Sequence, residues 1–300
     1  MRRQVANLFT GLLLLLFTAT LASAAETRER GALFRAEANG NTMYLYGTIH
    51  VGTPGFFPLE PRIEAALANA SVLALEVDAE RDMEGAMRAM QQYGMLAPGS
   101  TTYSAMKPEA RERLARALKR VNMNESALAF KPWMVATLLA VGEFGLHGFR
   151  PDLAVDSYLA RSARARNVKI EELESVGAQL ALFDRLSPED QQKMLEETVE
   201  AVENGKQDKE VRLMMAAWEN SDDAGLDRVL TMLEQEDTRS ARFFREVLLN
   251  ERNAGMADKL AALLKREKSS VAAVGVLHLL GKRGVPELLR AKGIKVERVY

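Results

Sequence analysis

The sequence contains no cysteine among its 300 residues. This absence excludes disulfide bonds, thiolate metal ligands, thiol nucleophiles and a lipidated N-terminal cysteine. The chain also lacks an excess of either charge, since 40 Lys and Arg stand against 41 Asp and Glu. There is thus no global electrostatic case for binding nucleic acid or an anionic membrane. Any nucleophile or metal ligand must be a histidine, a carboxylate, a hydroxyl or an amine.

Several catalytic motifs are missing as well. The chain has no H-E-x-x-H, G-x-S-x-G, Walker loop or G-x-G-x-x-G segment, which argues against zincins, serine hydrolases and nucleotide-binding proteins. With 27% charged and 47% hydrophobic residues, the composition is that of an ordinary globular protein rather than a disordered or fibrous one.

Residues 1–24 have the pattern of an export signal. Arg2–Arg3 give a basic start, Leu12–Phe17 is an unbroken apolar run, and Ala22-Ser23-Ala24 is the small-residue pattern that precedes cleavage. The apolar run is shorter than the ~20 residues that span a bilayer, which disfavours the alternative of an uncleaved anchor. We therefore expect a mature chain of residues 25–300, periplasmic in a Gram-negative host or secreted, with no stable membrane anchor.

Strands are expected near both ends of the mature chain and helices between them. Asn39-Gly40 separates two alternating segments and predicts a hairpin. The expected strands are 34–37, 42–46, 72–77, 168–173, 271–276 and 294–300. The expected helices are 63–70, 83–93, 108–121, 132–144, 152–166, several between 176 and about 264, and 285–292. This order predicts an α/β fold in which one sheet is flanked by helices and interrupted by a mostly helical insertion around residues 80–265.

Two of the three histidines share one local pattern, Gly-x-x-His. Gly47-Thr48-Ile49-His50 and Gly275-Val276-Leu277-His278 each follow a predicted strand, and the glycine there permits positive φ or close backbone approach. Sites in such sheets gather at the carboxyl ends of strands, where two imidazoles suit a divalent metal. The alternative is that both histidines only stabilise turns.

Carboxylates provide the next candidates. Glu76 lies in an otherwise apolar predicted strand and needs a metal, a histidine or an arginine as partner, because an unpaired buried charge costs several kcal/mol. The alternative is that Glu76 forms only a structural ion pair. Glu174 ends another strand, where the acidic neighbours Glu171 and Glu172 leave a solvated turn as the alternative. Arg252 is unexceptional by position alone.

Other residues have plainer interpretations. Met83, Met87 and Met90 form a helical stripe that is typical of core packing rather than of copper binding. His147 is expected to cap a helix or lie on the surface. Phe56-Phe57 can either form a lid beside His50 or pack its loop down.

The chain resembles the TraB/GumN family, which is related to the Tiki metalloproteases and more distantly to the ChaN-like proteins. The most specific segments are Tyr44–Gly52 and Val274–Gly281, the latter followed by Gly284, Leu288-Leu289 and Gly293. Leu75-Glu76, Leu173-Glu174 with Gln179, and Arg252-Asn253 are similar to further family motifs. The segment before Asp156 departs from the pattern, since Leu153-Ala154-Val155 stands where a glycine is expected, and Asp156 is therefore given no role.

This resemblance implies a mixed sheet with flanking helices, as in EreA/ChaN-like folds, and a divalent metal (Zn, Mn or Co) bound by His50 and His278. Glu76 would be the third ligand or the general base. Arg252 would hold a substrate carboxylate or a developing oxyanion, and Glu174 would orient an imidazole.

The expected function is a metal-dependent hydrolase, specifically a peptidase with a peptide or protein substrate and no nucleic-acid partner. Tiki-type relatives are regarded as metal-dependent peptidases, and TraB is associated with shutting down peptide pheromone signals. One alternative is a metal- or haem-binding envelope protein that uses the same histidines without turnover. Another is an envelope accessory protein that binds no metal. The identity of the substrate and the oligomeric state stay open.

Overall fold

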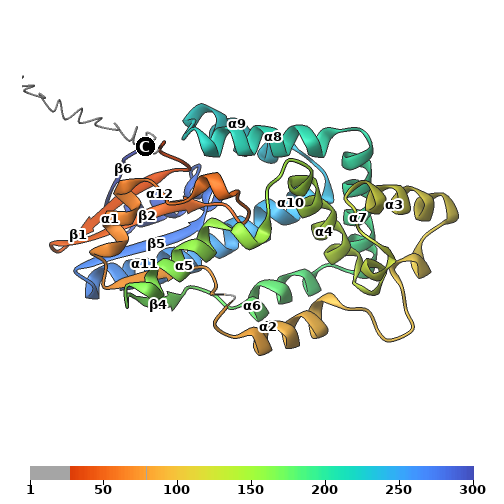
Figure 1. Cartoon of the computed structure of the whole chain (residues 1–300), viewed down its shortest axis with the longest axis horizontal. Coiled ribbons are helices and arrows are strands. Elements are labelled where there is room, and N and C mark those ends of the chain that lie inside the picture. The colour runs from red at the N-terminus through yellow and green to blue at the C-terminus, as the bar shows by residue number, and fades with distance from the viewer. Residues whose placement is uncertain (1–27, 79) are drawn as a thin grey trace, which may run out of the picture.

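The computed structural model describes residues 28–78 and 80–300; the expected export signal, residues 1–24, lies outside them. The described chain has an α/β fold built on one six-stranded mixed sheet with strand order β4-β3-β5-β2-β1-β6 (Figure 1). The strands are β1 (Leu33–Ala38), β2 (Asn41–Thr48), β3 (Val72–Leu75), β4 (Lys169–Glu172), β5 (Ser269–Gly275) and β6 (Lys295–Arg298). The predicted fold class is confirmed.

The Asn39-Gly40 turn joins β1 and β2 as the sequence predicts. Both residues have positive φ, 54° and 78°, as required at the two central positions of a tight hairpin turn. β6 pairs antiparallel with the other side of β1, whereas β2, β5, β3 and β4 are mutually parallel. The carboxyl ends of these four strands therefore share one edge of the sheet, which faces the helical insertion (Figure 1).

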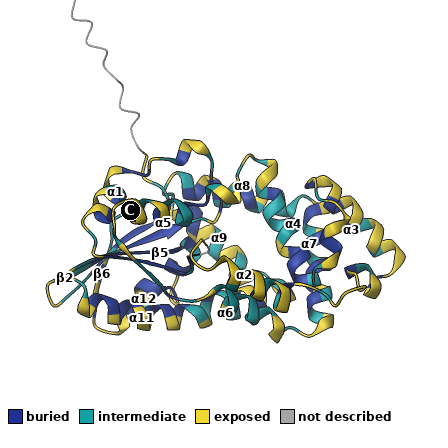
Figure 2. Ribbon diagram, turned by 60° about the horizontal axis from the view of Figure 1, so that its bottom comes forward, coloured by how far each residue is buried: buried dark blue, intermediate teal, exposed yellow. Residues whose placement is uncertain are grey.

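Helices cover both faces of the sheet (Figure 2). The helices α1 (Pro61–Ala68) and α5 (Val155–Ala165) lie on one face, and α11 (Arg252–Arg266) and α12 (Val285–Ala291) on the other. The apolar strands between them are buried almost completely, as expected for strands covered on both sides.

Most of the chain between β3 and β5 is helical, and part of it forms a second core. The helices are α2 (Met83–Ala89), α3 (Pro108–Arg120), α4 (Pro132–Leu146), α6 (Val176–Ala181), α7 (Pro188–Glu203), α8 (Lys206–Glu219), α9 (Asp223–Gln235) and α10 (Arg239–Phe243). The second core lies among α3, α4, α7 and α10, whereas the buried residues of α8 and α9 belong to the core of the sheet. In the second core Trp133 stacks on Phe183 with ring centroids 4.0 Å apart. The chain returns to the sheet once, through α5 and β4, and the π-helical turns Phe244–Glu251 lead from α10 into α11.

Local signals explain where several helices start. Proline occupies the first turn of α1, α3, α4 and α7, where its missing N–H costs no hydrogen bond. The Ser187 side chain also accepts a hydrogen bond from the Asp190 N–H, 3.1 Å away, and so caps α7.

Two expectations about packing are wrong. The side chains of Met83 and Met87 are not in the core, since these residues are 67% and 62% exposed. The side of α2 that packs against α6 is another one, where Ala89 lies near Gly177. Met90, the third residue of the stripe, is partly buried against the second core, as expected. β3 also ends at Leu75, so Glu76 follows the strand rather than lying inside it.

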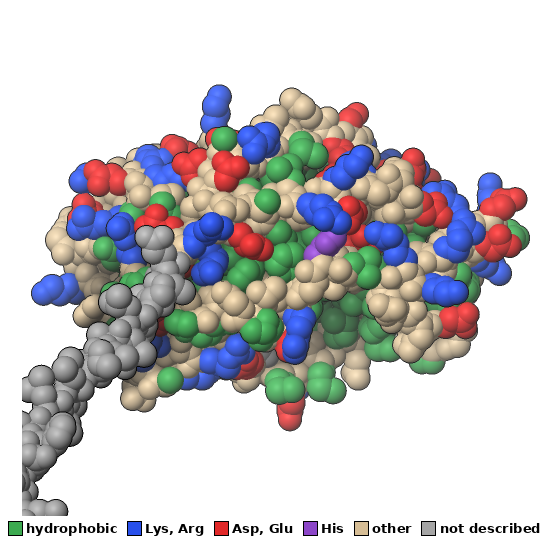
Figure 3. All heavy atoms as spheres, turned by 45° about the horizontal axis from the view of Figure 1, so that its top comes forward, with side chains coloured by type: hydrophobic (Ala, Val, Ile, Leu, Met, Phe, Trp, Pro, Cys, Tyr) green, Lys and Arg blue, Asp and Glu red, His purple; other side chains and the backbone are tan. Residues whose placement is uncertain are grey.

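The surface carries both signs of charge. On the face that Figure 3 shows, Lys and Arg alternate with Asp and Glu, and hydrophobic side chains gather in the hollows between them. No helix within residues 28–78 and 80–300 has the length and apolar character needed to cross a membrane.

Candidate functional site

Three of the predicted site residues meet at the shared carboxyl edge of the sheet. His50 comes two residues after β2, Glu76 directly after β3, and His278 in the 3₁₀ turn Val276–Leu279 that follows β5. Because β5 lies between β2 and β3 in the sheet, the three side chains converge above its last residue.

Gly275 marks the point of convergence. A Cβ atom at this residue would lie 3.3 Å from Oε1 of Glu76 and 3.6 Å from both Nε2 of His50 and Cδ2 of His278. The missing side chain thus leaves open the space that these groups surround.

Gly47 serves a different purpose, since its Cβ would lie 2.8 Å from Cγ2 of Val276 and 3.1 Å from the Val276 Cα. Neither Gly47 nor Gly275 has positive φ. Of the two reasons that the sequence offered for the glycines, close backbone approach applies to Gly47, and positive φ applies to neither.

Both imidazoles are held through Nδ1. Nδ1 of His50 lies 3.0 Å from Oδ2 of Asp156, and Nδ1 of His278 lies 2.6 Å from Oδ1 of Asn253. The Asn253 amide donates to the Arg283 carbonyl, 2.9 Å away, which turns its oxygen toward His278. Each Nδ1 is therefore the donor, and each Nε2 is the ring atom left to contact a ligand.

The surroundings of the two histidines shift their pKa values in opposite directions. Burial lowers the pKa of His278 to about 4, so this imidazole is neutral at pH 7. Desolvation also opposes the charge on His50, but Asp156 and Glu76 outweigh it and raise the pKa of His50 to about 9. This imidazole therefore carries both ring protons at pH 7 and must release the one on Nε2 to bind a metal ion. The His50 side chain is 61% exposed and the His278 side chain 6% exposed, so His50 is the histidine that solvent reaches.

The Glu76 carboxylate is buried and fully engaged. Oε1 accepts the Gly275 N–H at 2.6 Å and lies 3.7 Å from Nε2 of His278. Oε2 accepts hydrogen bonds from Nη2 of Arg252 and from Nε2 of Gln179, the latter 3.3 Å away. Burial alone would raise the pKa of Glu76, but the two histidines, Arg252 and the Gly275 N–H lower it to about 2. Glu76 is ionised at any pH near neutrality.

Arg252 and Glu174 form a second layer behind Glu76. Nε of Arg252 lies 3.1 and 3.0 Å from the two carboxylate oxygens of Glu174, and Nη1 donates to the Leu248 carbonyl at 3.0 Å. Gln179 donates to Glu174 at 2.8 Å. The Arg252 side chain is only 14% exposed.

The contacts in this layer differ from two of the expected roles. Glu174 contacts Arg252 and Gln179, not an imidazole, and Asp156 and Asn253 orient the imidazoles instead. Arg252 contacts the carboxylates of Glu76 and Glu174, so a substrate carboxylate would compete with them for this guanidinium.

Asp156 is the residue that sequence reasoning missed. It lies at the start of α5, and the Val155 N–H donates to the Ile49 carbonyl at 3.1 Å, which brings Asp156 beside His50. Two signals were present in the sequence. One is the acidic residue in the first turn of a predicted helix, a place that many carboxylates occupy for capping alone. The other is the family pattern around Asp156, which was set aside because Leu153-Ala154-Val155 stands where a glycine is expected.

The donors fit a divalent metal in chemical type. No three His, Asp or Glu side chains in the described part of the chain are spaced as the ligands of one ion. Two Nε2 atoms and one carboxylate oxygen are nevertheless the donors that zinc, manganese and cobalt accept. The exposed side of His50 leaves room for water to complete such a shell.

The other candidates have structural roles. Phe56 is buried with its ring centroid 5.1 Å from that of Trp218, and Phe57 stacks on Tyr158 at 4.4 Å, so both phenylalanines pack their loop down. His147 is the C-cap of α4, and its Nε2 lies 2.8 Å from Oδ1 of Asp208.

Comparison with known proteins gives one family and two relatives. The family model for TraB/PrgY/gumN matches residues 32–298, from β1 to β6. The uncharacterized protein YbaP of Escherichia coli strain K12 is 25% identical over 248 residues, which cover 82% of this chain and 87% of YbaP. YbaP of Shigella flexneri matches with the same values. No solved structure matches.

Proposed function

Because the chain belongs to the TraB/PrgY/gumN family, we propose that it is a metal-dependent hydrolase, specifically a peptidase, whose divalent ion is bound by His50 and His278. One observation carries this proposal. Two imidazoles from opposite ends of the chain are each fixed at Nδ1 by an oxygen, and their rings meet Glu76 around the open space above Gly275. Histidines that only stabilised turns would not need this shared orientation.

The residues divide the work in the following way. A divalent ion at this place supplies Lewis acidity toward a carbonyl oxygen and lowers the pKa of a bound water. Glu76 is better suited to be a ligand than a general base, because its lowered pKa makes it a weak proton acceptor. Arg252 keeps Glu76 ionised and in place, and Glu174 balances the charge of Arg252.

The proposal extends to substrate and location. We propose a peptide or protein substrate and no nucleic-acid partner, in keeping with the mixed charges of the face in Figure 3. We also propose that the mature chain begins at Ala25 after export to the periplasm or the medium. N-terminal sequencing of the protein from its native host tests the cleavage site.

A second candidate is supported by the same carboxylates. Both oxygens of Glu76 and both of Glu174 already accept hydrogen bonds, so neither carboxylate is poised to take a proton from water. A hydrolase needs a general base to take a proton from water, and a metal- or haem-binding protein without turnover does not. The absence of a poised base among Glu76 and Glu174 is the one observation that favours the binding protein.

Metal content and peptide cleavage, measured on one preparation, distinguish the candidates. The purified wild type, His50→Ala, His278→Ala and the control His147→Ala are dialysed against chelator and then supplied with zinc, manganese or cobalt. We expect stoichiometric metal in the wild type and His147→Ala, its loss in both other variants, and cleavage of a peptide library only with metal.

Each other outcome has a definite meaning. Metal without cleavage favours the binding protein. Neither metal nor cleavage, with all variants folded by circular dichroism, contradicts the site and leaves the paired histidines as structural turns.

A further inference from the structure

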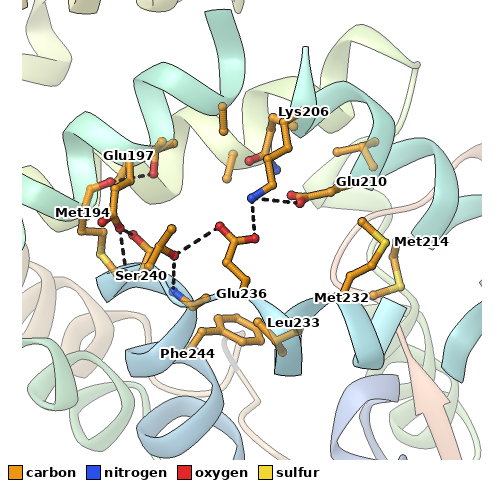
Figure 4. Close-up of a pocket in the computed structure, with 18 of the residues that line it drawn as sticks. Met194, Glu197, Lys206, Glu210, Met214, Met232, Leu233, Glu236, Ser240 and Phe244 are labelled. Carbon is orange, nitrogen blue, oxygen red and sulfur yellow. Dashed lines mark hydrogen bonds and ion pairs between the residues drawn. The ribbon is translucent and has the colours of Figure 1, made fainter. Parts of the chain in front are cut away.

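A cavity of about 600 Å³ lies within the helical insertion. Its walls come from α4, α7, α8, α9 and the segment around α10, and Figure 4 shows how their side chains surround it. None of the proposed site residues lines the cavity. Leu277, the neighbour of His278 in the chain, does line it, so the cavity lies beside the proposed site but is separate from it. A volume of this size is typical of sites for small organic ligands.

Most of the wall is apolar. Ala140, Phe144, Met194, Met214, Met232 and Phe244 all contribute side chains. Met232 and Phe244 are also among the few large hydrophobic residues of the described chain that remain exposed, at 43% and 37%. An apolar ligand in the cavity would cover side chains that are otherwise left in water.

The charged part of the wall is strongly unbalanced. It contains four glutamates, Glu197, Glu200, Glu210 and Glu236, and a single cation, Lys206. Glu197 is satisfied by the start of α10, because one of its oxygens accepts the Ser240 N–H at 2.9 Å. The remaining charges are therefore the ones available to a ligand.

Lys206 cannot neutralise both of its partners. Its ammonium contacts Glu236 and lies 3.7 Å from Glu210, and Figure 4 shows it placed between the two carboxylates. One ammonium against two carboxylates leaves a net negative charge at this end of the cavity. In agreement, burial and the nearby Glu236 raise the pKa of Glu210.

We infer that this cavity binds an amphiphilic cation, with the apolar part of the ligand between α4, α7 and α9 and an ammonium group beside Glu210 and Glu236. The apolar walls account for the chain of such a ligand, and the unbalanced carboxylates account for its charge. A long-chain amine and the free N-terminus of an apolar peptide share this chemistry.

Isothermal titration calorimetry with matched probes tests the inference. Decylammonium, decanol and decanoate have the same chain and differ in charge; each is used below the concentration at which it aggregates. We expect one binding site per protein, with decylammonium bound roughly tenfold more tightly than decanol and decanoate weakest, since a tenfold ratio corresponds to about 1.4 kcal/mol. A leucine-rich pentapeptide with a free N-terminus, compared with its N-acetylated form, shows whether a peptide is the natural source.

Variants connect the binding to the cavity. Glu210→Gln weakens decylammonium binding roughly five- to tenfold but leaves decanol binding unchanged, whereas Glu189→Gln at the exposed start of α7 changes neither. Ala140→Trp fills the cavity and abolishes binding of every probe, whereas Ala115→Trp on the exposed side of α3 does not.

The measurement does not depend on metal or on hydrolysis, so the result is independent of the proposed function. Equal binding of the three probes, preference for decanoate, or binding that survives Ala140→Trp would each overturn the inference.

Discussion

Gly47 and Gly275 occupy equivalent places in the two Gly-x-x-His segments, and each is required by a different neighbour. A side chain at residue 47 would collide with the backbone and side chain of Val276. A side chain at residue 275 would instead enter the space bordered by Glu76, His50 and His278. One glycine lets two strand ends approach, and the other keeps the proposed site open.

Replacing each glycine with alanine should have a different effect: the change at residue 47 lowers stability, and the change at residue 275 weakens metal binding. Gly47→Ala is expected to lower the free energy of unfolding by roughly 1–3 kcal/mol, because a methyl group is forced into packed atoms. Gly275→Ala is expected to fold normally but to lose zinc affinity by at least about tenfold, since the methyl group occupies part of the ligand's space. Urea unfolding and zinc titration on both variants check this. A larger loss of stability in Gly275→Ala than in Gly47→Ala would show that the assignment is reversed.

Asp156 gives a second prediction at the scale of one side chain. Asp156→Ala removes the oxygen that holds Nδ1 of His50, and loss of such partners typically weakens metal binding about 10- to 100-fold. Zinc titration of this variant measures the effect, and Asp227→Ala on the exposed side of α9 is the control. Unchanged affinity in Asp156→Ala would mean that Asp156 does not orient a ligand.

The sequence predicts the site residues that local patterns mark, but it does not predict which side chains pair with one another. His50, His278 and Glu76 are recognisable because a glycine, a strand or an apolar run stands beside them. Asp156 is 106 positions from His50 and Arg252 is 176 positions from Glu76. A local pattern carries no information about pairs that only the folded sheet brings together, so the roles assigned to Arg252 and Glu174 needed the structure.

Among the elements, α8 has an unusual link to the sheet through Trp218. This residue is fully buried, and its Nε1–H donates to the Gly47 carbonyl at 2.9 Å. Its own carbonyl accepts the Gly31 N–H at 2.6 Å. A helix of the insertion therefore fixes the end of β2 shortly before His50.

We expect Trp218→Phe to destabilise the protein by roughly 1–3 kcal/mol, the usual cost of leaving a buried carbonyl without its donor. Urea unfolding followed by circular dichroism measures the change. Phe244→Leu, which alters an exposed aromatic side chain, should stay close to the wild type. If Trp218→Phe does the same, the hydrogen bond to Gly47 contributes nothing to stability.

Local sequence predicts where helices and turns begin and end better than it predicts which side chains pack in the core. Asn39-Gly40 and the first-turn prolines place a hairpin and several helix starts correctly, because these residues act through their own backbone angles. The spacing of Met83, Met87 and Met90 predicts core packing, which holds for Met90 alone, because periodicity says only that residues share a helix face. Which face a neighbour covers depends on tertiary contacts, and here α6 packs against another side of α2.

On the scale of the whole molecule, Glu60 connects the middle of the sheet to the end of the chain. It is 1% exposed and accepts a hydrogen bond from the hydroxyl of Tyr300, the last residue. Its Oε2 and the nearby Tyr46 hydroxyl have no partner among the described residues. Burial raises the pKa of Glu60 above 4.5, despite the opposing effects of Tyr300 and Arg30.

The raised pKa of Glu60 predicts how stability depends on pH. The folded protein holds this proton more tightly than the unfolded chain, so the stabilisation is complete below pH 4.5 and is lost as the pH rises through the folded pKa. Glu60→Gln imitates the protonated form. Its free energy of unfolding should therefore increase relative to that of the wild type as the pH rises from 4 to 8, by an amount on the order of 1 kcal/mol.

Urea unfolding at several pH values measures this difference. Glu189→Gln is the control, because its carboxylate is exposed. A difference between Glu60→Gln and wild type that shrinks with rising pH would contradict the assignment.

The two histidines of the proposed site lie on either side of the helical insertion, one near each end of the chain. A ribosome makes protein chains from the N-terminus at about 5–20 residues per second, so His50 exists for on the order of ten seconds or more before His278 is made. During that interval β2 has no β5 beside it, and Trp218 arrives before β5 does. The proposed site is therefore incomplete until β5 and the turn that follows it have been made, and a chain truncated before residue 278 is expected to lack the proposed metal binding.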